Sequence, residues 1–127
     1  MSKINILIVE DESIIAMELE DRLNHMGYFV SGSIGNGDTA LKKIPELRPD
    51  LVLMDINIHG SRNGIETAVL IKEKYNIPFV YLTANNDSET MSRAFESQPY
   101  GFIVKPFRAN ELKSIIDGAI EKFNSES

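Results

Sequence analysis

Short apolar runs alternate with amphipathic segments of helix length along the whole chain, and this alternation limits the possible folds more than any other feature. The apolar runs have the length of strands and occupy residues 4–9, 29–34, 51–54, 79–83 and 101–104. Strict alternation with short connections predicts right-handed crossovers, and therefore a parallel sheet that helices cover on both faces. The sequence thus favours an α/β protein of five strands and five helices.

Five segments between and after these strands are predicted to be helices. Residues 13–26 and 65–75 each carry apolar side chains along one stripe. In the last segment the stripe consists of Leu112, Ile115, Ile116, Ala119, Ile120 and Phe123, and Asn110 is placed to cap its first turn. Helices are also expected over residues 38–47 and 88–97, although Pro45 removes a backbone donor from the first and the second offers the core few apolar side chains.

The order of the strands follows from how apolar each one is. Residues 4–9, 51–54 and 79–83 are the most continuously apolar and should lie in the middle, whereas Ser, Gly and Lys dilute the other two strands. The order 2-1-3-4-5 satisfies this pattern and defines a flavodoxin-like, doubly wound (βα)5 sandwich. A length of 127 residues, 43% of them hydrophobic, predicts one domain over residues 1–127 with a core from about 4 to 123.

Charge and composition argue against several classes of function. The net charge is -6 and no block rich in Lys and Arg offers a footprint for phosphates, so direct binding to nucleic acid is not expected. The absence of Cys excludes disulfides and thiolate metal sites. No apolar run reaches the ~20 residues of a membrane span, and residues 1–3 precede a strand rather than form a signal peptide. We expect a soluble, cytoplasmic protein without membrane insertion.

Reactive side chains stand where the predicted strands end. Glu10 and Asp11 follow the first strand, Asp55 follows the third, Thr83 ends the fourth and Lys105 follows the fifth. In a parallel sheet these positions meet at one edge, where doubly wound folds bind ligands. Crowded carboxylates repel one another unless a cation lies among them, and a site lined by oxygen suits Mg²⁺.

Such a site can carry phosphoryl chemistry. A carboxylate beside a divalent cation can attack phosphorus and form an aspartyl phosphate, provided that the charge on the phosphoryl oxygens is neutralised. Lys105 and the metal can share that task. Thr83 can donate a hydrogen bond to a phosphoryl oxygen, and the small Ala84 leaves room for the group to enter.

These residues together resemble a response-regulator receiver domain, the phospho-accepting half of two-component signalling, of the kind found in chemotaxis regulators. The likeness covers about residues 4–123. It is carried by an acidic pair in "ILIVEDE", an acceptor Asp in "LVLMDINI", a switch hydroxyl in "VYLTA" and a Lys-Pro signature in "GFIVKPF". Any one of these motifs is weak, but four in this order at strand ends are a strong signal.

The resemblance implies a role for each acid. Asp55 would be the phospho-acceptor, and Asp11 and Asp55 would bind Mg²⁺ directly, with Mn²⁺ as a substitute. Glu10 would help through water, and Asn57 would contribute its backbone carbonyl to the metal. Lys105 would contact the phosphoryl group.

The resemblance also implies a switch and its partners. Thr83 and Phe102 would be the switch residues, and the peptide bond between Lys105 and Pro106 would be cis. The phosphoryl group would come from the phosphohistidine of a sensor histidine kinase or a phosphotransfer protein. The face of the fourth helix, fifth strand and fifth helix would then change its output partner, which the sequence does not identify. The chain is expected to be a regulatory phospho-acceptor that assists its own phosphorylation and dephosphorylation, and not an enzyme.

The loop after Asp55 departs from the family pattern. The family usually has Pro four positions and Gly eight positions after the acceptor, whereas here position 59 is His and the matching glycine is Gly64. The loop "NIHGSRNG" is therefore one residue longer and lacks the rigid proline. This difference concerns the docking of partners more than the chemistry, since Asp55 and Asn57 keep their places.

Each singled-out residue also has an ordinary structural interpretation. The alternatives are an N-cap for Asp11, a solvated strand end for Lys105, a β-branched strand residue for Thr83 and a plain core or edge aromatic for Phe102. His25 and His59 are expected to face solvent, because no second His or Cys lies at ligand spacing.

Two other functions remain open at this point. An Asp-nucleophile phosphatase or phosphotransferase for small molecules usually has a second acid two residues after the nucleophile, where this chain has Asn57. A constitutive interaction module would be expected to have lost an acid, the Thr or the Lys. All of these residues are present, so this module ranks last.

Overall fold

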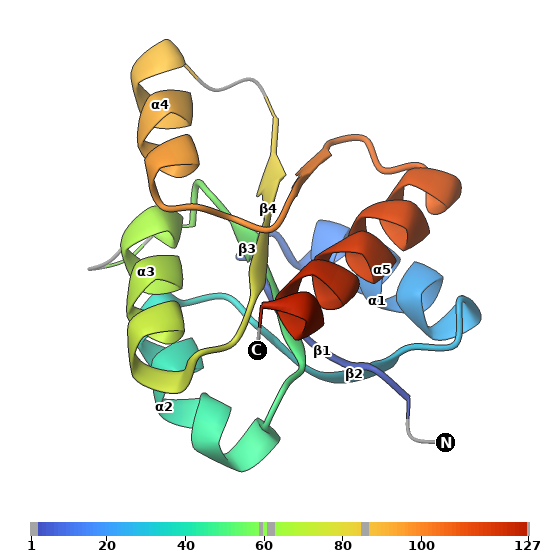
Figure 1. The fold of residues 1–127 in the computed structure, drawn as a ribbon. Coiled ribbons are helices and arrows are strands. Elements are labelled where there is room, and N and C mark those ends of the chain that lie inside the picture. The colour runs from blue at the N-terminus through green and yellow to red at the C-terminus, as the bar shows by residue number, and fades with distance from the viewer. Residues whose placement is uncertain (1–2, 59, 61–62, 85–86, 127) are drawn as a thin grey trace.

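The computed structural model describes residues 3–58, 60, 63–84 and 87–126, and within them five strands alternate with five helices (Figure 1). The strands are β1 (Asn5–Val9), β2 (Phe29–Ile34), β3 (Leu51–Asp55), β4 (Phe79–Thr83) and β5 (Phe102–Val104). The helices are α1 (Ser13–His25), α2 (Gly37–Leu47), α3 (Gly64–Tyr75), α4 (Ser88–Glu96) and α5 (Ala109–Ser125). No helix in the described ranges combines the length and the hydropathy that crossing a membrane requires.

The strands form one parallel sheet in the order β2-β1-β3-β4-β5. Every residue of β3 and β4 is buried, whereas the residues of β2 at the edge are half-buried or exposed. The predicted flavodoxin-like order is therefore confirmed. Its physical basis is that a strand covered on both faces must be apolar at every position, while an edge strand need not be.

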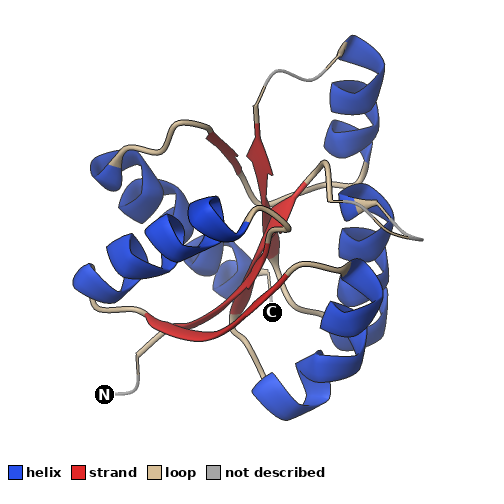
Figure 2. Cartoon of the chain, turned by 180° about the vertical axis from the view of Figure 1, so that it is seen from behind, coloured by secondary structure: helices blue, strands red, loops and turns tan. Residues whose placement is uncertain are grey.

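Successive residues of the central strands face two different helical layers. Ile6 and Ile8 pack in a core with side chains of α1 and α5, whereas Leu7 and Val9 pack in a second core with side chains of α2, α3 and α4. Figure 1 shows α1 and α5 on one side of the sheet and α2, α3 and α4 on the other, and Figure 2 shows the same layers from behind.

Side chains cap three of the helices at their first turn. Asn36, Asn63 and Asp87 each accept a hydrogen bond from the backbone N–H three residues further on. The predicted cap at Asn110 is wrong. Arg108 is the last extended residue before α5, so the helix begins at Ala109 and Asn110 already lies inside its first turn.

Pro45 lies in the last turn of α2 without ending the helix early. Because proline has no N–H, the carbonyl of Leu41, four residues before it, loses its helical partner. The hydroxyl of Tyr75 in α3 donates a hydrogen bond to this carbonyl at 3.2 Å. A neighbouring helix thus satisfies the group that the proline leaves open.

Candidate functional site

The carboxyl ends of four strands place the predicted site residues at one edge of the sheet. Val9 pairs with Met54 across β1 and β3, so Glu10 and Asp55 leave the sheet side by side. Thr83 pairs with Val104 across β4 and β5, and the backbone N–H of Lys105 donates to the carbonyl of Thr83 at 2.8 Å.

Glu10, Asp11 and Asp55 form a compact cluster of carboxylates. One oxygen from each lies within 4.8 Å of the others. Glu10 and Asp55 are buried, and Asp11 is half-buried. Three hard oxygen donors at this spacing, with one donor near solvent, fit an octahedral ion such as Mg²⁺ that keeps some of its water. Mn²⁺ has the same preference for oxygen ligands.

Lys105 provides positive charge at this cluster. Its Nζ lies 2.8 Å from Oε1 of Glu10 and 3.6 Å from Oδ2 of Asp55. The Lys105 side chain is 16% exposed. One ammonium is therefore shared between two buried carboxylates, with a third close by, and the cluster keeps an excess of negative charge.

The pKa shifts agree with this excess. The pKa of the Glu10 carboxyl is raised, because the effect of burial outweighs the lowering effect of Lys105. The neighbouring Asp55 also raises this pKa. For Lys105, burial lowers the pKa, but the hydrogen bond to Glu10 and the charge of Asp55 overcome it and the pKa is raised. The lysine is held charged, and the acids still favour a second cation.

The start of the loop after β3 is hydrogen-bonded to Asp55. The N–H of Asn57 donates to Oδ1 of Asp55 at 3.0 Å. Gly64 opens α3 so close to this strand that a Cβ at its position would collide with the carbonyl of Asp55. The glycine noted in the sequence is therefore required for packing. Within the loop, His59, Ser61 and Arg62 lie outside the described residues.

Thr83 and Phe102 both contact α4. Thr83 is buried, with 3% of its surface exposed, and its Oγ1 lies 3.8 Å from Sδ of Met91. The ring of Phe102 is half-buried and lies 4.7 Å from the ring of Phe95, measured between centroids. The Phe95 side chain itself is mostly exposed and covers the ring of Phe102. The two predicted switch residues thus meet the same helix.

The surroundings of Asp11 and His25 test two of the ordinary interpretations. The N-cap position of α1 is Glu12, not Asp11, so the capping alternative for Asp11 is wrong. His25 faces solvent as predicted, with its side chain 78% exposed. The peptide bond between Lys105 and Pro106 is cis.

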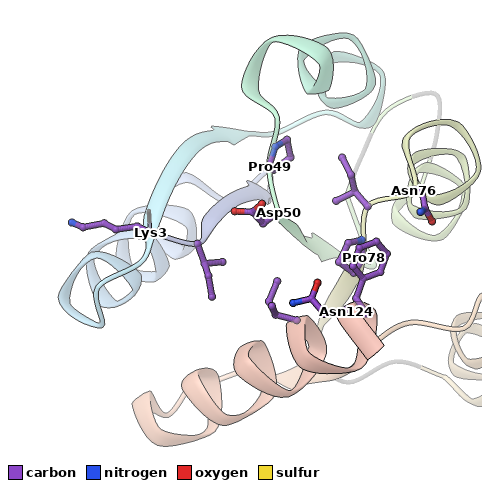
Figure 3. Close-up of a pocket in the computed structure, with 10 residues that line it drawn as sticks. Lys3, Pro49, Asp50, Asn76, Pro78 and Asn124 are labelled. Carbon is purple, nitrogen blue, oxygen red and sulfur yellow. The ribbon is translucent and has the colours of Figure 1, made fainter. Parts of the chain in front are cut away.

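A surface pocket lies away from the acid cluster. A pocket of about 360 Å³ at the amino ends of the strands is lined by residues that include Lys3, Pro49, Asp50, Asn76, Pro78 and Asn124 (Figure 3). It contains none of the residues that sequence analysis assigned to the site.

Comparisons with known proteins point to one family. The family model for the response regulator receiver domain matches residues 6–117. The transcriptional regulatory protein PdtaR of Mycobacterium tuberculosis is 36% identical over 118 residues, which cover 93% of this chain and 57% of PdtaR. The DNA-binding response regulator MtrA of Mycobacterium leprae is 35% identical over 121 residues, which cover 95% of this chain and 53% of MtrA. The chain thus spans little more than half the length of these curated relatives.

Comparison with solved structures points to the same family. The signal receiver domain of a modulated diguanylate cyclase from Desulfovibrio desulfuricans superposes with a TM-score of 0.95 at 37% identity, covering 99% of this chain and 100% of that one. The N-terminal domain of a response regulator/sensory box/GGDEF 3-domain protein from Carboxydothermus hydrogenoformans has a TM-score of 0.87 at 30% identity. This match covers 96% of our chain and 98% of that domain.

Proposed function

The chain belongs to the family of response regulator receiver domains, and from this premise we propose that it accepts a phosphoryl group on Asp55. The donor is the phosphohistidine of a sensor histidine kinase or a phosphotransfer protein in the cytoplasm. The single observation that carries the proposal is the ammonium of Lys105 shared between the buried carboxylates of Glu10 and Asp55, beside Asp11.

The transfer step is a displacement at phosphorus. An oxygen of Asp55 forms the new bond to phosphorus as the bond between phosphorus and the histidine nitrogen of the donor breaks. The electron pair of the broken bond stays on that nitrogen, and the imidazole leaves neutral when its other nitrogen already carries a proton. Little covalent chemistry is asked of the protein, so positioning and charge dominate.

The residues at the carboxyl edge divide this work. A bound Mg²⁺, held by Asp11, Asp55 and the carbonyl of Asn57 with Glu10 acting through water, would neutralise charge on the phosphoryl oxygens. Lys105 stabilises the charge that spreads over those oxygens, and the hydroxyl of Thr83 donates a hydrogen bond to one of them. The same groups would assist attack by water on the aspartyl phosphate, so the chain would regulate its own dephosphorylation.

The surface beside the site supports a protein as the donor. Ile14 and Met17 on α1 are 79% and 69% exposed, directly after the acids that follow β1. We propose that a helix of the phosphorylated partner packs on this apolar pair while its phosphohistidine reaches Asp55. The output of the switch would pass through the face of α4, β5 and α5.

The proposal is tested with the small phosphodonor acetyl phosphate. Intact-mass spectrometry should show one phosphoryl adduct that forms with Mg²⁺ or Mn²⁺ and not in EDTA, because the metal must neutralise the approaching group. The control is Asp55→Asn, which should show no adduct. An adduct that persists in this variant rules out Asp55 as the acceptor, and an adduct that forms equally well in EDTA rules out the proposed role of the metal.

A further inference from the structure

The segment that carries Lys105 lies between two elements and has no regular structure of its own. It runs from the end of β5 at Val104 to the start of α5 at Ala109. Arg108, at the N-cap of α5, makes no side-chain cap. Because the lysine side chain is long and flexible, the position of its ammonium depends on where this backbone is held.

Arg22 on α1 holds the segment from outside. Its Nη1 donates a hydrogen bond to the carbonyl of Phe107 at 3.1 Å, across 85 positions of sequence. Its Nη2 donates to Oε1 of Glu18 at 3.0 Å, one turn earlier in the helix. The Phe107 side chain is buried in the core that contains Ala16 and Leu19 of α1. The residue two positions after Lys105 is therefore bonded to α1 through its carbonyl, and its ring shares a core with side chains of α1.

The same helix is also tied to the acids. The N–H of Glu12, the N-cap residue of α1, donates to Oε2 of Glu10 at 3.1 Å. Helix α1 thus contacts the acid cluster at its beginning and the Lys105 segment through Arg22. It can set the separation of the lysine from the carboxylates.

We propose that Arg22 is a positioning residue for phosphoryl transfer. Its guanidinium fixes the carbonyl of Phe107, and through this backbone it places the Lys105 ammonium between Glu10 and Asp55. This role rests on the proposed function of the chain. Arg22 contacts neither the acids nor the phosphoryl group in this assignment, so its effect must pass through Lys105.

The test compares rates of Asp55 phosphorylation by acetyl phosphate with Mg²⁺ present. Arg22→Met keeps the aliphatic stem and removes the donors, and it should slow the reaction about fivefold, the factor that corresponds to ~1 kcal/mol of lost hydrogen bonding. Arg22→Lys retains a donor and should recover most of the rate. The matched control is Glu18→Gln, which removes the ion pair of Arg22 but leaves its bond to Phe107, and it should react like the parent chain.

A second background separates positioning from a general loss of structure. In Lys105→Met chains, Arg22→Met should cause no further slowing, because the group that it positions is already gone. Equal rates for Arg22→Met and the parent, or a fivefold loss that persists without Lys105, would overturn the role of Arg22. If Arg22→Met melts below the assay temperature, the same cycle is run with Arg22→Gln, whose shorter side chain does not span to Phe107. A parent chain that takes no phosphoryl group overturns the proposed function itself, and this role with it.

Discussion

The three acids of the carboxyl edge have different neighbours, and this separates what each one does. Glu10 is buried and pairs with Lys105 at 2.8 Å. Asp55 is buried and receives the N–H of Asn57 on one oxygen while the other faces Lys105. Asp11 is only half-buried and is not the cap of α1. Of the three, Asp11 should contribute least to folding and most directly to metal binding.

Asp11→Ala should therefore separate metal binding from stability. We expect the affinity for Mg²⁺, measured by titration calorimetry, to fall at least about tenfold, because an ionised oxygen ligand is lost. The melting temperature in EDTA should stay unchanged or rise slightly, since one of three carboxylates within 4.8 Å is removed.

The matched control is Asp21→Ala, which removes the same charge from an exposed position of α1. It should leave the affinity for Mg²⁺ at the parent value. If Asp11→Ala instead melts many degrees lower in EDTA, Asp11 is chiefly a structural residue.

Among the five helices of the described residues, α4 has the fewest buried residues. Ala94 is its one buried residue in the described chain, and Phe95 is 63% exposed. Its C-terminal end is held by the hydroxyl of Tyr81 on β4, which lies 2.6 Å from Oγ of Ser97. Helices with few buried apolar contacts can shift at low cost. Figure 1 shows α4 projecting beyond the carboxyl end of β4.

Thr83→Ala should uncouple this helix from the site. Phosphorylation adds a charge of about -1.5 to -2 beside Asp55 and should draw the Thr83 hydroxyl away from Met91. Phe102 could then change rotamer against Phe95, and α4 would follow. The variant should still take up a phosphoryl group at Asp55 but lose much of the conformational response.

The measurement is a pair of amide NMR spectra with and without the phosphoryl mimic beryllofluoride. In the parent chain, and in Thr39→Ala on the exposed side of α2 as control, shifts should extend over residues 88–104. Shifts of the same size there in Thr83→Ala would show that the hydroxyl is not the coupling group.

For the whole molecule, the strand order and the clustering of the acids with Lys105 could be predicted from sequence, because both depend on patterns along the chain. Burial on both faces makes a strand uniformly apolar, as in β3 and β4, and parallel strands bring their ends to one edge. The acid pair and Lys105 therefore meet although 95 positions separate Glu10 from Lys105.

Contacts between a side chain and a distant group could not be predicted in this way. Arg22 bonds to the carbonyl of Phe107, and Tyr75 bonds to the carbonyl of Leu41, and neither contact leaves a periodic signal in sequence. The prediction of a helix cap at Asn110 was wrong for a related reason. An Asn anywhere near a helix start gives the same signal, and only the backbone of Arg108 shows where extension ends.

One such contact joins Tyr28, the residue before β2, to α5 and should make overall stability depend on pH. The hydroxyl of Tyr28 donates to Oδ1 of Asp117 at 2.6 Å. Burial, above all, raises the pKa of Tyr28 above its ordinary 10.0, and the nearby carboxylate adds to this shift. For Asp117, burial raises the pKa, but the hydrogen bond from Tyr28 and the charge of Lys113 outweigh it and the pKa lies below its ordinary 3.8.

Tyr28→Phe should reveal this dependence, because it removes the hydroxyl and keeps the buried ring. Because the carboxyl pKa is lowered in the folded state, the contact stabilises the fold above pH 3.8, and this stabilisation is lost as the pH falls through the folded pKa. Because the phenol pKa is raised, the contact stabilises the fold below pH 10.0, and this stabilisation is lost as the pH rises through the folded pKa. The free energy of unfolding by urea should thus be about 1 kcal/mol lower in the variant near neutral pH, the usual worth of one hydrogen bond. This difference should shrink near pH 3 and near pH 11, roughly one unit beyond each ordinary value.

Tyr75→Phe is the matched control in the acid range, because its acceptor is the carbonyl of Leu41, which does not titrate. A deficit in Tyr28→Phe that stays constant from neutral to acid pH, as in the control, would mean that Asp117 is not the group that links Tyr28 to stability.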